Sequence, residues 1–244
     1  MNKLIIPLVA CIACAIIVSI TAVTVRPDQN INIANEKKVK ILAAAGIQTD
    51  RVDEEFSKIK TLFVDFKTNK LVTIDPAYDH IKAASNPELS TLIPKGEDIA
   101  VLKRRENIGT LYVWVDQKNS IEKLVLPIRG YGLWGTLYGY LSLDSDLNTV
   151  RGIEYYDHKE TPGLGGEVDN PNWKSDWYGK RVYSDNGSVA LYVTKGVSST
   201  EYEIDGLSGA TLTTNGVSNM IKYWLGENGY GPIIKNLNKE IEKI

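Results

Sequence analysis

The stretch TLYVWVD, residues 110–116, alternates the apolar side chains of Leu111, Val113 and Val115 with the large rings of Tyr112 and Trp114. Alternation with a period of two is typical of a β-strand, whose successive side chains point to opposite faces of a sheet. The stretch therefore predicts a strand and marks the start of a β-rich region.

Further strands are expected on the C-terminal side of this stretch. They are predicted at 124–128, 137–143, 149–156 and 189–193. Residues 144–148 are rich in Asp, Ser and Asn, which favour turns. This predicted turn lies between the strands at 137–143 and 149–156 and therefore joins them into a hairpin.

A helix is predicted after the strands, and Gly226 is its expected end. Its apolar residues share one face: Val217, Met220, Ile221, Trp224 and Leu225. Spacings of three and four residues place them in a single stripe that can pack on a sheet. The sequence therefore predicts an α+β domain, an antiparallel sheet with packed helices.

The region before the strands gives weaker signals. Residues 36–46 are good helix formers, and Phe56, Ile59 and Phe63 continue a helix-like spacing. Prolines divide residues 67–108 into short pieces, for which no fold is predicted.

The N-terminus carries an uncharged run of 22 residues, from Leu4 to Val25. As a helix it extends roughly 33 Å, enough to cross the hydrocarbon core of a membrane. A cleaved signal peptide is the alternative, but its apolar stretch is usually about 7–15 residues long. The sequence favours a retained single-span anchor at 1–26, with a polar linker at 27–35. Lys3 weakly favours a cytoplasmic N-terminus and an exterior C-terminal domain.

Composition argues against several classes of function. A net charge of -2 is unfavourable for a nucleic-acid partner, which requires a broad cationic face. Cys11 and Cys14 lie inside the predicted span and are interpreted as small apolar residues, although Cys11 also ends a weak lipoprotein-like box. Two histidines, His80 and His158, are too few for a histidine metal site, so no metal is expected.

The first segment whose residues could bind a ligand is DGLSGATLT, residues 205–213, directly before the last predicted helix. Glycine and alanine allow a ligand to approach the backbone, and Ser208, Thr211 and Thr213 supply hydroxyls. The first amides of the helix favour an anion, so the segment is a candidate phosphate seat. Simple capping of the helix by Ser or Thr is the alternative that the residues alone leave open.

The second segment is ETPGLGGE, residues 160–167. Its glycines and proline predict an irregular loop with exposed amides that can lie against a flat ring. An ordinary surface turn has the same composition.

Together the two segments resemble a known family. SGAT at 208–211 resembles the flavinylation motif of FMN-binding domains, and ETPGLG at 160–165 resembles a loop of the same domains. GYGLW at 130–134 is similar to an element of the C subunits of sodium-translocating NADH:quinone reductases. The resemblance covers roughly residues 122–234 and includes 170–173, 178–180 and 224–226.

The resemblance implies that Thr211 bears FMN through a phosphoester bond installed by a flavin transferase. Asp205 is expected to brace the turn or to aid the transferase. The other implied cofactor-binding residues are Ser208, Gly209, Ala210, Leu212 and Thr213 on the phosphate side, and Glu160, Thr161, Gly163, Leu164 and Gly165 on the isoalloxazine side, with Trp134, Trp173 and Lys180 as secondary candidates.

The resemblance also implies a setting. An electron-carrying subunit of the sodium-translocating reductase would work with an NADH-oxidising FAD/iron–sulfur subunit and an integral flavin-bearing subunit. It would be anchored in the bacterial inner membrane, with its C-terminal domain in the periplasm. The expected domains are the anchor at 1–26, a linker and mixed region at 27–108, and the FMN-binding domain at 109–244.

Three alternatives remain at this level. One is the paralogous flavoprotein subunit of an Rnf-type ferredoxin:NAD oxidoreductase, which bears the same motif. Another is a hydrolase with Ser208 or Thr211 as nucleophile and His158 as base, although the chain lacks a Gly-x-Ser-x-Gly elbow. The third is an anchored exterior binding module without redox chemistry.

Overall fold

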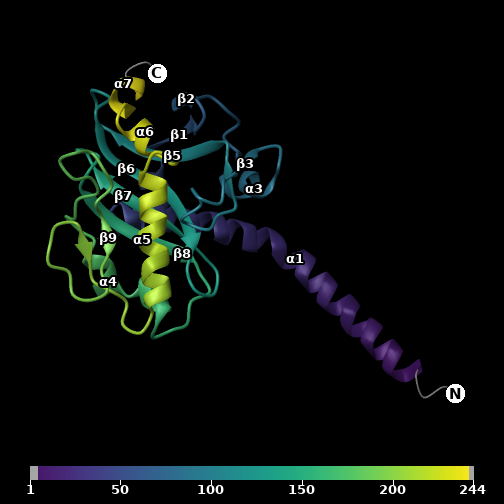
Figure 1. The fold of residues 1–244 in the computed structure, drawn as a ribbon. Helices are drawn as coiled ribbons and strands as arrows, with labels where there is room; N and C mark the ends of the chain where they lie inside the picture. Colours follow the sequence, from purple (N-terminus) through teal and green to yellow (C-terminus); the bar gives the residue numbers. More distant parts are fainter. Residues whose placement is uncertain (1–4, 242–244) are drawn as a thin grey trace. The chain divides into compact units, whose positions relative to one another are not determined.

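The computed structural model of the protein describes residues 5–241 (Figure 1). The chain separates into two compact units, with the boundary between Val39 and Lys40. The start of the predicted span at Leu4, and Lys3 before it, lie outside the described residues.

The first unit consists of helix α1, which begins at Ile5 and continues into the second unit to end at Ala44. Among the described residues, α1 is the one helix long and apolar enough to cross a membrane. The segment predicted as a polar linker, 27–35, is helical, because α1 runs through it with Pro27 inside the helix. A proline removes one backbone hydrogen bond of the helix, which the remaining turns of a long helix can tolerate.

The second unit is built on a six-stranded antiparallel sheet with the strand order β2-β1-β5-β6-β7-β8. Its strands are β1 (Ile59–Asp65), β2 (Lys70–Val72), β5 (Ile108–Val115), β6 (Ile121–Tyr131), β7 (Thr136–Asp144) and β8 (Val150–Asp157). The predicted antiparallel sheet and the hairpin around residues 144–148 are thereby confirmed.

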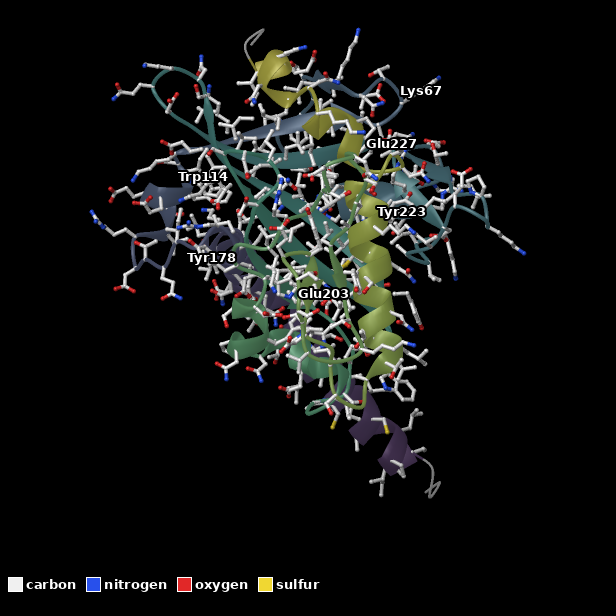
Figure 2. All side chains as sticks on the ribbon, turned by 60° about the vertical axis from the view of Figure 1, so that its left-hand side comes forward. Lys67, Trp114, Tyr178, Glu203, Tyr223 and Glu227 are labelled. Atoms are coloured by element: carbon white, nitrogen blue, oxygen red, sulfur yellow. The ribbon has the colours of Figure 1, made fainter. Side chains whose placement is uncertain are left out.

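The alternation in β5 decides which layer each side chain joins. Leu111 and Val113 enter the main core beneath helix α5 (Thr211–Leu225), whereas Tyr112 and Trp114 enter a second cluster with Ile41 and its neighbours at the end of α1. Figure 2 shows Trp114 and α5 on opposite sides of the sheet. Both faces of the sheet are therefore covered, and α5 is held firmly on one of them.

The helix-like spacing of Phe56, Ile59 and Phe63 was misleading. Helix α2 ends at Phe56 after one turn (Val52–Phe56), and Ile59 begins strand β1. Phe63 pairs with Thr110 of β5, so cross-strand pairing overrides a local spacing that fits either structure.

The remaining elements are short. They are α3 (His80–Ser85), β3 (Ser90–Leu92), β4 (Arg104–Glu106), the 3₁₀ helix η1 (Gly165–Asp169), α4 (Pro171–Ser175), β9 (Tyr192–Val193), β10 (Glu203–Ile204), α6 (Gly231–Ile234) and α7 (Leu237–Ile241). Of the strand predicted at 189–193, only Tyr192 and Val193 form a strand, which pairs in parallel with β10. Val189 instead forms an isolated bridge with Tyr183.

The turn between β7 and β8 is organised by one carboxylate. Asp146 accepts hydrogen bonds from the backbone amides of Asn148 and Thr149 and from the hydroxyl of Thr149. Partial burial would raise the pKa of Asp146, but these hydrogen bonds outweigh it and hold the pKa below its usual 3.8.

We therefore expect Asp146→Ala to reduce the free energy of unfolding at pH 7 by on the order of 1 kcal/mol, since it removes hydrogen bonds to a charged group. A depressed folded-state pKa stabilises the protein above about pH 3.8 and loses that contribution as the pH falls through the folded value. The difference between wild type and variant in urea denaturation should shrink below that pH. A pH-independent difference would contradict this assignment.

Candidate functional site

The site predicted from DGLSGATLT lies at the N-terminus of α5. Ala210 is the residue that caps the helix, and it offers no side-chain acceptor to the first amides. The alternative of simple capping by Ser or Thr is therefore wrong. Gly209 has a φ of +71°, a left-handed conformation that glycine adopts at no steric cost. The loop thus delivers Thr211 to the first position of a helix whose first turn has no side-chain cap.

The hydroxyls of the segment differ sharply in exposure. Ser208 and Thr211 are exposed, whereas Thr213 and Thr214 are buried. The Thr213 hydroxyl donates to Oε2 of Glu160 at 2.5 Å. Of the two threonines predicted to face the cofactor, Thr211 is therefore the exposed one.

The loop 160–167 lies against this helix start. A Cβ added to Gly209 would lie 3.0 Å from Cδ2 of Leu164, and one added to Gly165 would lie 2.5 Å from Oγ1 of Thr213. Two motifs about fifty positions apart in the sequence thus share one surface, on which Thr161, Gly163 and Leu164 are exposed.

Glu160 occupies a different position from the one expected. Its side chain is buried, and its carboxylate accepts hydrogen bonds from the amides of Leu133 and Trp134 and from Thr213. This brings the third motif, GYGLW at 130–134, to the same site.

Exposed apolar side chains occur in all three motifs. Five of them are large: Tyr131, Leu133, Trp134, Leu164 and Leu212, which are 40–62% exposed. Leu133 belongs to the GYGLW element but was not among the expected cofactor-binding residues, because its neighbourhood depends on the turn between β6 and β7. Large apolar groups that remain exposed on one face are typical of a surface that receives a flat ligand or a partner.

Two of the secondary candidates, Trp173 and Lys180, brace the loop that leads to α5, together with Asp205. Trp173 is buried and donates from its indole nitrogen to the carbonyl of Asp205 at 2.7 Å. The Asp205 carboxylate accepts from the amide of Ser198 at 2.6 Å. Lys180 contacts the carbonyl of Thr200 at 3.2 Å. These three predicted residues thus hold the backbone of residues 198–205, which precedes the motif at Ser208.

His158 is not placed to activate a nucleophile. Its Nε2 lies 2.8 Å from Oδ2 of Asp169, and its Nδ1 accepts from the amide of Glu160 at 3.2 Å. Both ring nitrogens are thereby engaged away from Ser208 and Thr211, so the geometry does not support the hydrolase alternative.

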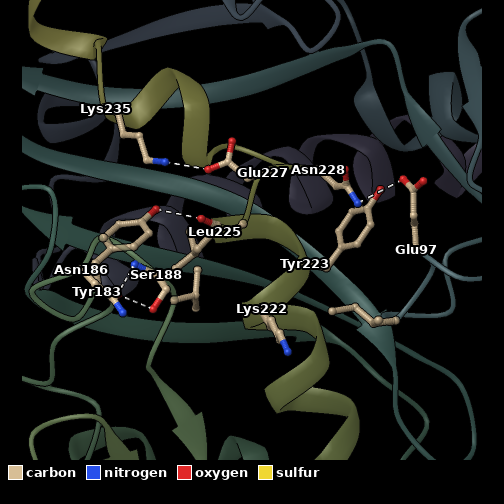
Figure 3. Close-up of a pocket in the computed structure, with 14 residues that line it drawn as sticks. Glu97, Tyr183, Asn186, Ser188, Lys222, Tyr223, Leu225, Glu227, Asn228 and Lys235 are labelled. Atoms are coloured by element: carbon tan, nitrogen blue, oxygen red, sulfur yellow. Dashed lines mark hydrogen bonds and ion pairs between the residues drawn. The ribbon is translucent and has the colours of Figure 1, made fainter.

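A pocket of about 480 Å³ lies at the opposite, C-terminal end of α5 (Figure 3). Its charged and polar groups are largely engaged with one another: Lys235 pairs with Glu227 at 2.6 Å, and the Tyr183 hydroxyl donates to the carbonyl of Leu225. Among residues 5–241, no group of three His, Cys, Asp or Glu side chains is arranged to hold a metal ion.

Comparisons with known proteins identify the family of the chain. The FMN-binding domain family matches residues 132–226, which contain all three motifs except the first two residues of GYGLW. The chain is 43% identical to the C subunit of the Na+-translocating NADH-quinone reductase of Pseudomonas aeruginosa, over 98% of this chain and 96% of that protein. It is 42% identical to the C subunit of the same enzyme of Vibrio anguillarum, over 91% and 89% of the two chains.

Solved structures have the same fold. The crystal structure of Shewanella oneidensis NqrC superposes with a TM-score of 0.77 at 33% identity, covering 84% of this chain and 97% of that one. The corresponding protein from Parabacteroides distasonis gives a TM-score of 0.67 at 27% identity, covering 86% and 96%. The chain therefore belongs to the family of Na+-translocating NADH-quinone reductase C subunits.

Proposed function

We propose that the protein relays electrons within a Na+-translocating NADH:quinone reductase through an FMN bound covalently to Thr211 by a phosphoester. Family membership supports the complex, and the FMN-binding domain supports the cofactor. The observation that carries the covalent proposal is the exposed position of Thr211 at a helix start without a side-chain cap. The relatives are C subunits of the sodium-translocating enzyme, which favours this complex over the Rnf-type alternative.

The start of α5 suits a phosphodiester. Its free amides and the positive end of the helix dipole stabilise one negative charge close to Thr211. Gly209 and Ala210 leave the approach to these amides open. In this proposal Ser208, Gly209, Ala210, Leu212 and Thr213 form the phosphate side of the site.

The isoalloxazine side is proposed to lie along the loop 160–165. Leu164 is 44% exposed and touches the backbone at Gly209, so it can pack on a ring face beside the phosphate. Thr161, Gly163 and Gly165 supply backbone groups along the same edge. FMN, when bound, accepts and passes on electrons, whereas the protein positions it and sets its electrostatic environment.

Asp205 is proposed to serve the flavin transferase indirectly. Its carboxylate holds Ser198, and its own amide donates to Asp176 at 2.7 Å, so the loop before Ser208 is preformed. A preformed loop presents Thr211 to the transferase without an ordering cost. The proposed partners beyond the transferase are the NADH-oxidising FAD/iron–sulfur subunit and the integral flavin-bearing subunit.

Mass spectrometry of the peptide around Thr211 tests the proposal directly. A mass increment of FMN minus water on Thr211 is the expected result for protein purified with its complex. An unmodified peptide from such protein would refute the covalent attachment.

The proposed topology places residues 1–26 as the anchor and the FMN-binding domain, 109–244, in the periplasm. We expect a cysteine introduced at the exposed position Gln117 to react with a membrane-impermeant maleimide in intact cells, in a background where Cys11 and Cys14 are replaced by Ser. The matched Asn2→Cys variant should react only after the membrane is opened. The reverse pattern of labelling would place the domain in the cytoplasm.

A further inference from the structure

We infer that Glu160 is a positioning residue whose buried carboxylate fastens the turn at 130–134 to the first turn of α5, rather than a ligand of the cofactor. Its functional consequence, the correct presentation of Thr211 to the flavin transferase, rests on the function proposed above. The claim that Glu160 fastens the turn to α5 in the unmodified protein does not depend on that function.

The two carboxylate oxygens of Glu160 serve different segments. Oε1 accepts from the amides of Leu133 at 3.0 Å and Trp134 at 2.9 Å, and Oε2 accepts from the hydroxyl of Thr213 at 2.5 Å. The side chain is 5% exposed, so its oxygens are turned inward and away from a ligand on the surface. One side chain therefore ties three parts of the chain together.

The carboxylate of Glu160 is stabilised by hydrogen-bond donors. Among the ion pairs formed by the described residues 5–241, none includes Glu160. A buried carboxylate without a cation is tolerated only where donors surround it, and the start of α5 contributes its positive dipole end. Loss of the carboxylate therefore leaves the donors of the turn without their acceptor.

Glycines allow the close packing of Glu160, the turn at 130–134 and α5. A Cβ on Gly132 would lie 2.6 Å from Oε1 of Glu160, and one on Gly165 would lie 2.5 Å from Oε2. A Cβ on Gly216 would lie 2.3 Å from the carbonyl oxygen of Tyr131, which shows how closely the turn approaches α5. Glycine is therefore required at Gly132 and Gly165 for the same reason, because both positions pack closely against the carboxylate of Glu160.

The turn that Glu160 holds carries Trp134, which is 62% exposed, whereas the other four tryptophans are at most 8% exposed. Quenching of tryptophan fluorescence by acrylamide in the unmodified protein therefore reports mainly on Trp134, with Trp134→Phe as the blank. Hydrogen exchange of the peptide 131–135 reports on the two amides that Glu160 accepts.

The test compares Glu160→Ala, Glu160→Gln and the matched control Glu167→Ala in the full-length chain. Glu167 lies in the same loop, and its carboxylate accepts only from the side chain of Asn170 among the hydrogen bonds of the described residues. We expect Glu160→Ala to speed exchange of the peptide 131–135 at least tenfold, to change acrylamide quenching of Trp134, and to slow flavin attachment by the transferase at least tenfold. Glu167→Ala should match wild type.

Glu160→Gln should rescue both measurements to within about threefold of wild type, because its oxygen can accept from the two amides and its NH₂ can donate to Thr213. Near-wild-type exchange and attachment in Glu160→Ala would overturn the inference. So would a Gln variant with wild-type exchange but Ala-like attachment, since the carboxylate would then act in the chemistry. If the wild-type protein itself accepts no flavin, the proposed function is refuted. The hydrogen-exchange data would still test whether Glu160 holds the turn at 130–134 against α5.

Discussion

Thr211→Val is expected to abolish the covalent flavin, so that the denatured protein loses its in-gel fluorescence completely. Valine has almost the shape of threonine and lacks only the hydroxyl, which the phosphoester requires. Thr211 is exposed at the first helical position, where the two residues have similar helix propensities, so the free energy of unfolding should stay within about 0.5 kcal/mol of wild type.

Two control variants distinguish loss of the hydroxyl that bears the flavin from a general disturbance of the motif. Thr211→Ser keeps a hydroxyl and should retain attachment, at a reduced rate. Ser208→Ala removes the other exposed hydroxyl of the motif and should leave the flavin on Thr211. Undiminished fluorescence in Thr211→Val would show that another residue bears the flavin.

Arg129→Met should reduce the free energy of unfolding by about 3–5 kcal/mol, because it leaves the charge of Glu106 buried without a partner. The two guanidinium NH groups of Arg129 meet the two oxygens of Glu106 at 3.0 and 2.6 Å, and the side chains are only 8% and 1% exposed. Burial alone would lower the pKa of Arg129, but Glu106 outweighs this and raises it. The guanidinium also lies 5.0 Å from the ring centre of Trp224 in α5.

Chemical denaturation of the variants provides the measurement and its controls. Arg51→Met removes an exposed partner of Glu54 and should cost less than about 1 kcal/mol. The double variant Glu106→Leu with Arg129→Met should recover much of the loss, since no unpaired charge remains. A loss below about 1 kcal/mol in Arg129→Met would contradict the proposed cost of the unpaired carboxylate.

Much of the fold could be predicted because several signals are local. The alternation in residues 110–116 reports burial on two faces of a strand, and the apolar stripe of 217–225 reports burial on one face of a helix. Strand β1 was missed because Ile59 and Phe63 have a spacing that both structures allow. Their pairing with β5, some fifty residues later, decides between them.

The site shows the same division. The motifs around Thr211 and Leu164 could be identified by resemblance, and their meeting agrees with it. The orientation of Glu160 could not, because a carboxylate in a loop is usually solvated, and only the approach of two other segments provides its three donors. Leu133 and His158 gain their surroundings in the same way.

Local sequence signals were enough to predict the apolar N-terminal helix, the antiparallel sheet with its covering helix, and the threonine proposed to bear FMN, since each depends on neighbouring residues or a short motif. The burial of individual hydroxyls, the continuation of α1 through Pro27 and the joining of three motifs by one carboxylate could be seen only in the folded chain. Burial and hydrogen bonding between segments distant in the chain depend on packing, and local sequence carries little information about it.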